Sequence, residues 1–199
     1  MPARKPRRKF GASQKDRIFF ACLPDAETAV RIHALAGRLK QEHGFTGTLI
    51  LPEHLHVTLF HLGDWAALPE PIVKLAMEAA AQVRAAPFEV TFRRAESFGN
   101  RTGIYPFVLT GAKDIAQWRG LHDALGAALK RGGLGGATQG EFKPHITLLR
   151  DEVRARPIVL TLPISWTVRE FVLIHSLLGK TTHVHLGRWP LGGQPDGIP

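Results

Sequence analysis

The stretch HLHVTLFHLG, residues 54–63, shares its pattern with a second stretch of the chain, KPHITLLRD, residues 143–151. Each contains a histidine, an aliphatic residue, a threonine and a leucine in that order, at residues 56–59 and 145–148. Side chains alternate between the two faces of a β-strand, so each stretch presents an imidazole and a hydroxyl on one face and aliphatic anchors on the other. If the two strands lie side by side, two histidines and two threonines converge on one cavity.

This set of side chains suits chemistry at a phosphodiester. A neutral histidine can take a proton from an attacking oxygen, and a protonated histidine can give one to the leaving oxygen. Threonine hydroxyls can donate to the non-bridging phosphate oxygens, which carry the negative charge. Neither a metal nor a covalent intermediate is required, so we expect no cofactor. The predicted catalytic residues are His56, Thr58, His145 and Thr147.

The charge of the chain is uneven along its length. The formal net charge is +9, and residues 1–17 hold seven Lys/Arg and one Asp, which gives +6 for that segment. Such a segment is typical of a disordered arm that binds an anionic polymer, or of a solubilising tail without a specific partner. We expect a basic disordered tail at 1–16, a single domain at 17–191 and a loose C-terminal tail at 192–199.

The composition is that of an ordinary soluble globular protein. Hydrophobic residues make up 44% of the 199 residues, enough for a sizeable core in one large domain or two small lobes. A single cysteine, Cys22, cannot form an internal disulfide. The apolar segment RIFFACL, residues 17–23, is too short for a signal-peptide core and runs into a charged segment. We therefore expect a cytoplasmic protein without a membrane segment.

Strand and helix patterns follow one another in an irregular order. Apolar residues recur at helical spacing in three segments: one from Asp25 to Gly44, one that starts at Pro69, and one over 113–130. The expected strands are 17–23, 55–62, 87–99, 104–111, 145–149, 158–162, 168–178 and 182–189. Most strands are separated by hairpin-sized turns, so the predicted fold class is α+β. The glycine-rich segment 132–140 lacks the spacing of a nucleotide P-loop and is interpreted as a flexible connector.

In their surroundings, the two histidine motifs resemble those of the 2H phosphoesterases, and in detail the RNA 2′,3′-cyclic phosphodiesterases, also called 2′-5′ RNA ligases. The resemblance covers most of residues 17–191 and includes RIFFACLPDAET, LPEHLHVTLFHLGD, FKPHITLLRD and FVLIHSLLGKTTHVHLGRWPL. It implies a bilobal α+β fold with pseudo-twofold symmetry. Each lobe contributes an antiparallel sheet with helices outside, and a cleft between the lobes holds both motifs. Near the end, where the family often has a tyrosine in a G-x-x-Y setting, this chain has Gly179 followed by Thr181, Thr182 and His183.

The resemblance also implies an activity. It is the opening of a 2′,3′-cyclic phosphate, on an RNA end or a nucleotide, to leave a 2′-phosphate without a metal. His56 matches the acid that protonates the departing O3′, and His145 matches the base that activates water. Thr58 and Thr147 match the phosphate-binding hydroxyls, and Arg150 matches a basic residue after the second motif. The reverse reaction would be a 2′-5′ RNA ligation.

Other residues near the motifs are candidates for binding the substrate. Strict alternation puts Arg150 on the face away from the catalytic groups, so the strand must end or bulge near Leu149 for Arg150 to reach a phosphate. Phe60 lies by alternation on the face of the first catalytic histidine, where it could stack on an RNA base or belong to the core. Phe142 has the same two interpretations. Lys143 could guide the RNA backbone.

Two other functions stay open. His54 with His56, and His183 with His185, form H-x-H pairs at strand spacing, which is a geometry for zinc ligands, although no Cys, Asp or Glu cluster accompanies them. Alternatively, the fold could bind RNA or nucleotides without catalysis. The partners we expect are RNA ends or nucleotides with a 2′,3′-cyclic phosphate, and we expect a monomer. Two further strand histidines, interpreted as surface or hydrogen-bonded core residues, are His61 and His175.

Overall fold

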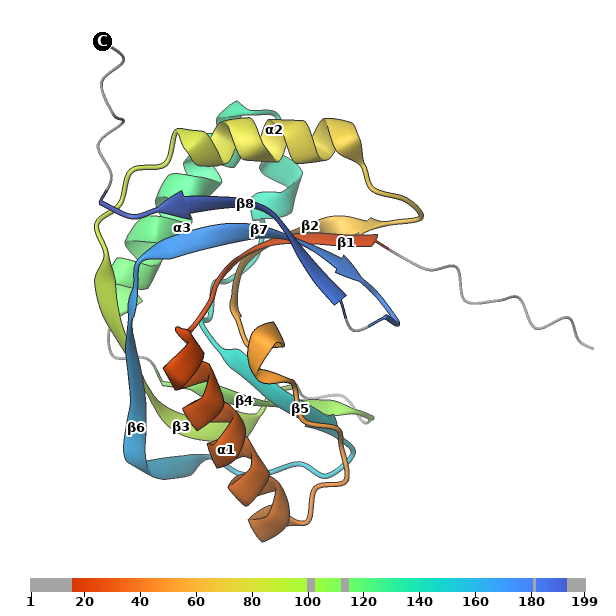
Figure 1. The fold of residues 1–199 in the computed structure, drawn as a ribbon, viewed down its shortest axis with the longest axis vertical. Coiled ribbons are helices and arrows are strands. Elements are labelled where there is room, and N and C mark those ends of the chain that lie inside the picture. The colour runs from red at the N-terminus through yellow and green to blue at the C-terminus, as the bar shows by residue number, and fades with distance from the viewer. Residues whose placement is uncertain (1–15, 100–102, 112–114, 181, 193–199) are drawn as a thin grey trace, which may run out of the picture.

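The protein is described here by a computed structural model, which covers residues 16–99, 103–111, 115–180 and 182–192. In these residues eight strands form one antiparallel sheet in the order β6-β3-β4-β5-β2-β1-β7-β8. The strands are β1 (Asp16–Cys22), β2 (Val57–Trp65), β3 (Phe88–Ser97), β4 (Tyr105–Thr110), β5 (Ile146–Asp151), β6 (Ile158–Val168), β7 (Glu170–Leu177) and β8 (Thr182–Pro190). The helices are α1 (Ala26–His43), α2 (Glu70–Ala81) and α3 (Ile115–Arg131), with short 3-10 helices η1 (Pro52–His54) and η2 (Gly135–Thr138). The predicted α+β class is confirmed (Figure 1).

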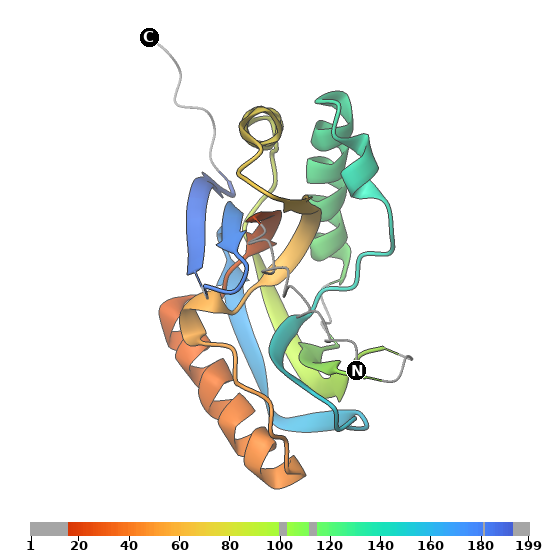
Figure 2. The ribbon, with the colours of Figure 1, turned by 90° about the vertical axis from the view of Figure 1, so that its right-hand side faces the viewer.

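The sheet consists of two four-stranded halves that meet at one point. One half is β6-β3-β4-β5 and the other is β2-β1-β7-β8, and they join through the pair Val57–Ile146 between β2 and β5. Helix α1 packs on the first half, against β5 and β6, while α2 packs against α3 and β8. Figures 1 and 2 show the halves one above the other, with α1 beside the lower half and α2 and α3 at the upper one. This is the bilobal, pseudo-twofold arrangement that the family resemblance implied.

Helix α1 begins and ends where its sequence signals indicate. The carboxylate of Asp25 accepts a hydrogen bond from the backbone N–H of Thr28 at 2.8 Å, which caps the first turn. Gly44 ends the helix with φ of 68°, a left-handed conformation that glycine adopts without steric cost. The residues of α1 that face the core are Thr28, Ala29, Ile32, Ala36 and Leu39.

The strands differ from the predicted ones mainly in length. The first histidine strand begins at Val57 because residues 52–54 form the 3-10 helix η1, with Pro52 in its first turn. Strand β6 extends to Val168 and includes Pro163, which the edge of a sheet tolerates because proline lacks a backbone donor. The glycine-rich connector contains η2. Asn100, in the predicted turn, lies outside the described residues.

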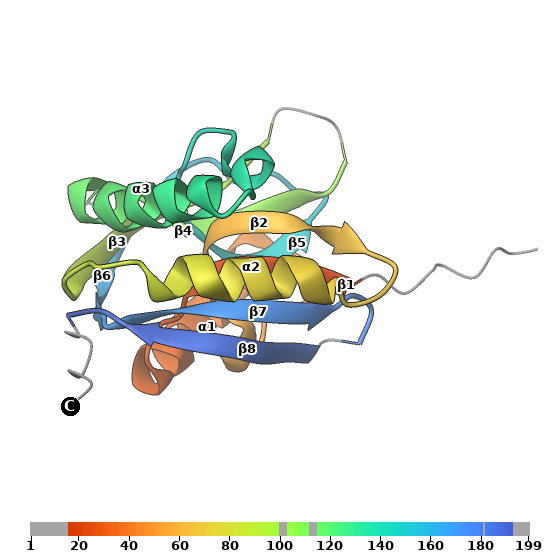
Figure 3. The ribbon, with the colours of Figure 1, turned by 90° about the horizontal axis from the view of Figure 1, so that it is seen from above.

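The two faces of β1 point to different environments. Ile18 and Phe20 belong to the main core, which α2 and α3 cover on the outside of this half (Figure 3). Phe19 and Ala21 point the other way and pack in a small cluster with Val172, Ile174 and Leu23. Strand β1 starts at Asp16, one residue earlier than the expected domain boundary. Within the described ranges, no helix combines the length and apolar character needed to span a bilayer.

Candidate active site

The two motif strands lie next to each other at the centre of the sheet. Because β2 and β5 are antiparallel and Val57 pairs with Ile146, His56 lies across from Thr147 and Thr58 across from His145. All four catalytic candidates line one cavity of about 440 Å³. The other residues that line it are Arg17, Phe19, Ile50, His54, His61, Arg150, Ser176 and His183. The predicted convergence of the two motifs is therefore confirmed.

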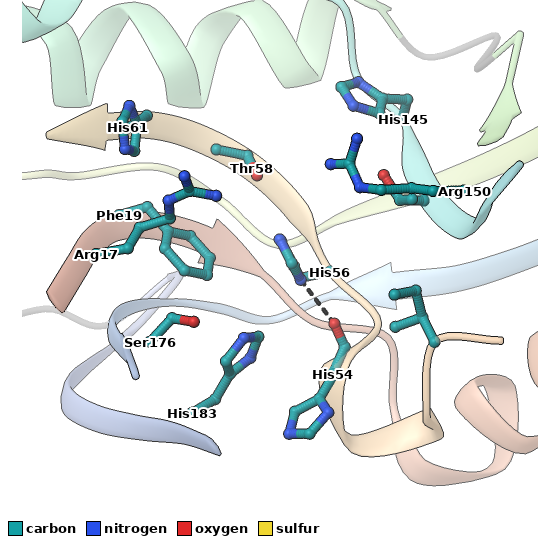
Figure 4. Close-up of a pocket in the computed structure, with 12 residues that line it drawn as sticks. Arg17, Phe19, His54, His56, Thr58, His61, His145, Arg150, Ser176 and His183 are labelled. Carbon is teal, nitrogen blue, oxygen red and sulfur yellow. Dashed lines mark hydrogen bonds between the residues drawn. The ribbon is translucent and has the colours of Figure 1, made fainter. Parts of the chain in front are cut away.

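Both motif histidines are held by the same backbone contact. Nδ1 of His56 lies 2.7 Å from the carbonyl oxygen of His54, and Nδ1 of His145 lies 2.8 Å from that of Lys143. A carbonyl oxygen only accepts, so Nδ1 carries the proton in each ring. In the neutral ring Nε2 is then an acceptor, and in the imidazolium it is a donor. Each ring can thus serve as a base or an acid through Nε2 (Figure 4 shows the His56 contact).

Arg150 reaches the cavity because β5 contains a β-bulge. Thr147 and Leu149 pair with the adjacent β4 residues Val108 and Phe107, so β5 has one extra residue between them. Leu148 and Leu149 are consequently both buried, and the exposed Arg150 returns to the face of His145 and Thr147. The bulge near Leu149 that a phosphate-binding role for Arg150 requires is therefore confirmed.

A second bulge lies at the equivalent place in β2. Thr58 and Phe60 pair with the adjacent β1 residues Ala21 and Phe20, so β2 has one extra residue between them. The ring of Phe60 is 5% exposed and stacks on His122, with centroids 4.1 Å apart. The prediction that Phe60 shares the face of His56 is wrong, because the bulge turns it into the core. His61 takes the place on the cavity wall, where strict alternation would not have put it.

One wall of the cavity consists of groups that the sequence did not assign to the site. The rings of His54 and His183 lie 4.5 Å apart, and His183 meets Phe19 edge-on at 5.7 Å. Ser176, opposite His183 in the β7–β8 register, completes this wall. Alternation along β1 could have placed Phe19 opposite the core face, but nothing in the sequence indicates that β8 approaches η1.

A second unassigned group is an ion-pair cluster on β1 and β2. Arg17 donates to Asp64 from Nε and Nη2, both at 2.8 Å, and Nε2 of His61 lies 2.9 Å from Oδ1 of the same carboxylate. Hydrogen bonds from Arg17 and then from His61 hold the pKa of Asp64 well below its usual range. Asp64 therefore stays ionised and orients both basic side chains.

The free site favours neutral imidazoles. The pKa of His56 is lowered to about 4, mainly by burial; the hydrogen bond with the His54 carbonyl opposes this shift, and the charge of His145 adds to it. The pKa of His183 is also lowered to about 4, by burial first and then by the charges of His56 and His54. No carboxylate lines the cavity among the described residues, whereas Arg150 does. A bound anion would raise both histidine pKa values.

Phe142 and Lys143 lie beside the cavity that the two motifs line. They line an adjoining cavity of about 660 Å³ that shares Thr58, His61 and His145 with the first. The further residues that line it include Phe98, His122 and the segment 136–141 around η2. The ammonium of Lys143 lies 4.5 Å from the centroid of the Phe98 ring, while Phe142 stacks on His122 at 4.2 Å. Both residues can therefore meet only the part of a substrate that extends beyond the catalytic groups.

The H-x-H pairs do not form a set of four zinc ligands. His185 lies outside the cavity lining, and Arg188 approaches its Nδ1 at 2.6 Å. In the part of the chain that the structure describes, no group of three or more His, Cys, Asp or Glu has the arrangement of a metal site. The zinc interpretation therefore has no ligand set to support it in those residues.

Fold and cavity together define the class of the protein. An antiparallel bilobal α+β fold with one H-x-T strand from each half at a shared cavity is that of a 2H phosphoesterase. The family model described as the 2′-5′ RNA ligase superfamily matches residues 24–180, and the chain belongs to this superfamily.

Known relatives agree with this membership over nearly the whole chain. The RNA 2′,3′-cyclic phosphodiesterase of Escherichia coli strain K12 is 28% identical over 186 residues, which are 90% of this chain and 98% of that protein. The crystal structure of E. coli LigT complexed with 3′-AMP has a TM-score of 0.69 at 26% identity, over 90% of this chain and 99% of its own. For the protein TT0787 of Thermus thermophilus the TM-score is 0.67 at 25% identity, over 89% and 99% of the two chains.

Proposed function

We propose that the protein hydrolyses 2′,3′-cyclic phosphates on RNA ends or nucleotides to 2′-phosphates, without a metal. The observation that carries this proposal is the matched pair of histidines, one from each half, whose Nδ1 atoms are held by backbone carbonyls. Both Nε2 atoms are thereby free to exchange protons with a ligand in the shared cavity. The named activity of the E. coli relative supports the same substrate class.

The reaction needs an acid and a base on opposite sides of phosphorus. His145 acts as the base that removes a proton from water, and the resulting hydroxide attacks the cyclic phosphate. His56 acts as the acid that protonates O3′ as the O3′–P bond breaks, which leaves a 2′-phosphate. Thr58 and Thr147 donate to the non-bridging oxygens, and Arg150 neutralises their charge.

The low pKa of His56 in the free protein is compatible with its role as the acid. A phosphate anion next to Nε2 stabilises the imidazolium, so His56 takes up its proton when substrate binds. His56 is partly buried, so this attraction is screened less than it would be at an exposed site. Ligation, the reverse reaction, would additionally need a second RNA end held at the cavity in place of water.

The direct test is incubation of the purified protein with a nucleoside 2′,3′-cyclic phosphate in the presence of EDTA. We expect hydrolysis to the 2′-phosphate, identified by phosphorus NMR, and no hydrolysis by a variant that carries both His56→Ala and His145→Ala. Binding without turnover would instead favour the non-catalytic module. Turnover only after zinc is added would favour the metal-dependent alternative.

A further inference from the structure

The two motif strands are alike beyond the H-x-T motif itself. Residues 57–61 and 146–150 have the same order of burial: buried, partly buried, buried, buried and exposed. In both strands a bulge after the threonine creates this order. The residue that ends each stretch, His61 in one and Arg150 in the other, returns to the wall of the same cavity. His61 is therefore the pseudo-twofold counterpart of Arg150.

His61 does not act alone on its side of the cavity. Arg17 faces Asp64 in the β1–β2 register, and Asp64 accepts hydrogen bonds from both Arg17 and His61. These contacts use Nε and Nη2 of Arg17 and Nε2 of His61. No described residue accepts a hydrogen bond from Nη1 of Arg17 or contacts Nδ1 of His61 by hydrogen bonding. The Nη1 amino group of Arg17 and one ring nitrogen of His61 are left for a ligand.

The charge of this cluster suits an anion. Arg17 and Asp64 cancel, so the cluster is neutral with a neutral imidazole at His61 and carries one positive charge with an imidazolium. In the imidazolium form both ring nitrogens of His61 are donors, Nε2 toward Asp64 and Nδ1 toward a ligand. Guanidinium groups bind phosphate oxygens with well-defined geometry, and Asp64 already fixes the orientation of Arg17.

We infer that Arg17 and His61 form a second anion subsite, which binds the 5′-phosphate of the nucleotide whose 2′,3′-cyclic phosphate lies between His56 and His145. This inference rests on the proposed function. Figure 4 shows Arg17 and His61 on one side of the cavity and Arg150 with His145 on the other. A nucleotide likewise carries its 5′-phosphate and its cyclic phosphate at opposite ends of the ribose.

The size and position of the cavity agree with this substrate class. Its volume of about 440 Å³ lies within the range of roughly 300–1,000 Å³ that small-molecule sites occupy, so it has room for more than a lone phosphate. His61 also borders the adjoining cavity lined by Lys143 and Phe98. An RNA strand that continues from the 5′-phosphate would enter this second cavity. The preferred substrates are therefore cyclic-phosphate ends that carry a 5′-phosphate or phosphodiester.

The test compares adenosine 2′,3′-cyclic phosphate with the same compound carrying a 5′-phosphate. We expect the unmodified protein to prefer the 5′-phosphorylated substrate in kcat/KM by about 10- to 100-fold, the value of one or two charge-assisted hydrogen bonds. His61→Gln and Arg17→Gln should each reduce this preference by about tenfold. His61→Arg, which copies the other half, should retain it. Lys74→Gln, which removes an exposed charge on α2, serves as the control and should retain it too.

Binding of product analogues separates this inference from the proposed function. Titration calorimetry should show that adenosine 2′,5′-bisphosphate binds more tightly than adenosine 2′-phosphate, and that His61→Gln removes the difference. If neither cyclic substrate is hydrolysed, the proposed function fails while this binding comparison still tests the subsite. Equal affinities, or equal effects of His61→Gln and Lys74→Gln, would overturn the subsite. Thermal melts show whether a loss of binding results from unfolding. This control matters most for Arg17→Gln, because that substitution breaks the ion pair with Asp64.

Discussion

Gly47 packs against the main chain of Arg150 so closely that a Cβ atom added at Gly47 would lie 2.0 Å from the Arg150 carbonyl oxygen. Asp151 holds the two segments together, because its carboxylate accepts hydrogen bonds from the backbone N–H groups of Thr46 and Gly47, each at 2.6 Å. The end of β5, which carries Arg150 into the cavity, is thus anchored by a loop that contains no catalytic residue.

We predict that Gly47→Ala lowers both stability and activity. The added methyl group must displace the Arg150 backbone, which should reduce the free energy of unfolding by about 1–3 kcal/mol and misplace the guanidinium. Urea denaturation and kcat/KM measure the two effects. Gly37→Ala is the matched control, since Gly37 lies within α1 and its added Cβ would meet only a side-chain carbon of Leu49 at 3.9 Å, and it should stabilise the protein by about 0.5–1 kcal/mol. Equal stability of the two variants would contradict the close contact.

The division of labour between the histidines can be separated by the leaving group. His56→Ala and His145→Ala should each lower kcat by roughly 10² to 10⁴, the contribution of a positioned acid or base. A phosphodiester substrate with a better leaving group should partly restore the rate of His56→Ala and leave that of His145→Ala low. The exposed His43 provides a control through His43→Ala. Restoration of His145→Ala alone would reverse the two roles.

Arg150→Ala should lower kcat/KM by about 10- to 100-fold, because it removes a charge-assisted contact to the phosphate. The side chain is exposed, so the free energy of unfolding should change little. Arg156→Ala, at another exposed arginine, controls for the loss of one positive charge. Normal kinetics in Arg150→Ala would show that its position on the cavity wall has no role in turnover.

The lowered histidine pKa values predict a loss of stability on acidification. His56 and His183 have pKa values of about 4 in the folded protein, against about 6.5 in an unfolded chain. Below pH ~6.5 the unfolded state therefore binds more protons than the folded state. The contribution of both histidines to the free energy of unfolding is thus complete above that pH and falls as the pH drops toward 4. Urea titrations at several pH values should show this decline, and it should be smaller in His183→Gln. A pH-independent free energy over this range would contradict the shifts.

The same shifts predict proton uptake on ligand binding. A phosphate that raises the pKa of His56 must draw a proton from the buffer near pH 6. Calorimetric titration with inorganic sulfate, a similar anion that does not itself titrate near pH 6, in buffers of different ionisation enthalpy should reveal this uptake, and His56→Ala should reduce it. Identical heats in all buffers would show that the imidazole stays neutral in the complex.

The basic segment before β1 should contribute to binding of long RNA. Residues 1–15 contain six Lys/Arg and no acidic residue. Deletion of this segment should weaken binding and flatten its salt dependence, because fewer counterions are released. Fluorescence anisotropy of a labelled RNA over a series of salt concentrations measures both quantities. An unchanged salt slope would show that the segment does not contact RNA.

Local patterns in the sequence predicted the parts of the site that depend on a single strand. The H-x-T motifs and their alternation placed His56 and His145 with their threonines, and the position of Arg150 required a bulge that β5 contains. The equivalent bulge in β2 was not predicted, because a bulge depends on how the neighbouring strand pairs. Phe60 was therefore assigned to the wrong face, and His61 was interpreted as a surface or hydrogen-bonded core residue.

The positions of His183 and Arg17 on the cavity lining could not be predicted from the sequence, for a related reason. His183 meets His54 only because β8 lies at the edge of the half that contains β2, and this order of strands is a long-range property of the sheet. Arg17 carries no local signal that distinguishes it from the basic residues before it. His183 belongs to an H-x-H pair that suggested zinc ligands, and Arg17 belongs to no repeated pattern, so only the folded arrangement assigns the two residues to this cavity.

The single pair Val57–Ile146 between the two halves has an evolutionary consequence. His56 and His145 directly precede the paired residues, so a main-chain contact, which any side chain permits, fixes how far apart the two imidazoles stand. Substitutions in the core of either half can accumulate without changing that separation, as long as the two strands still pair. Relatives that retain only 26% of the residues can thus keep the same overall structure, and the spacing of the two histidines can persist while almost everything around them diverges.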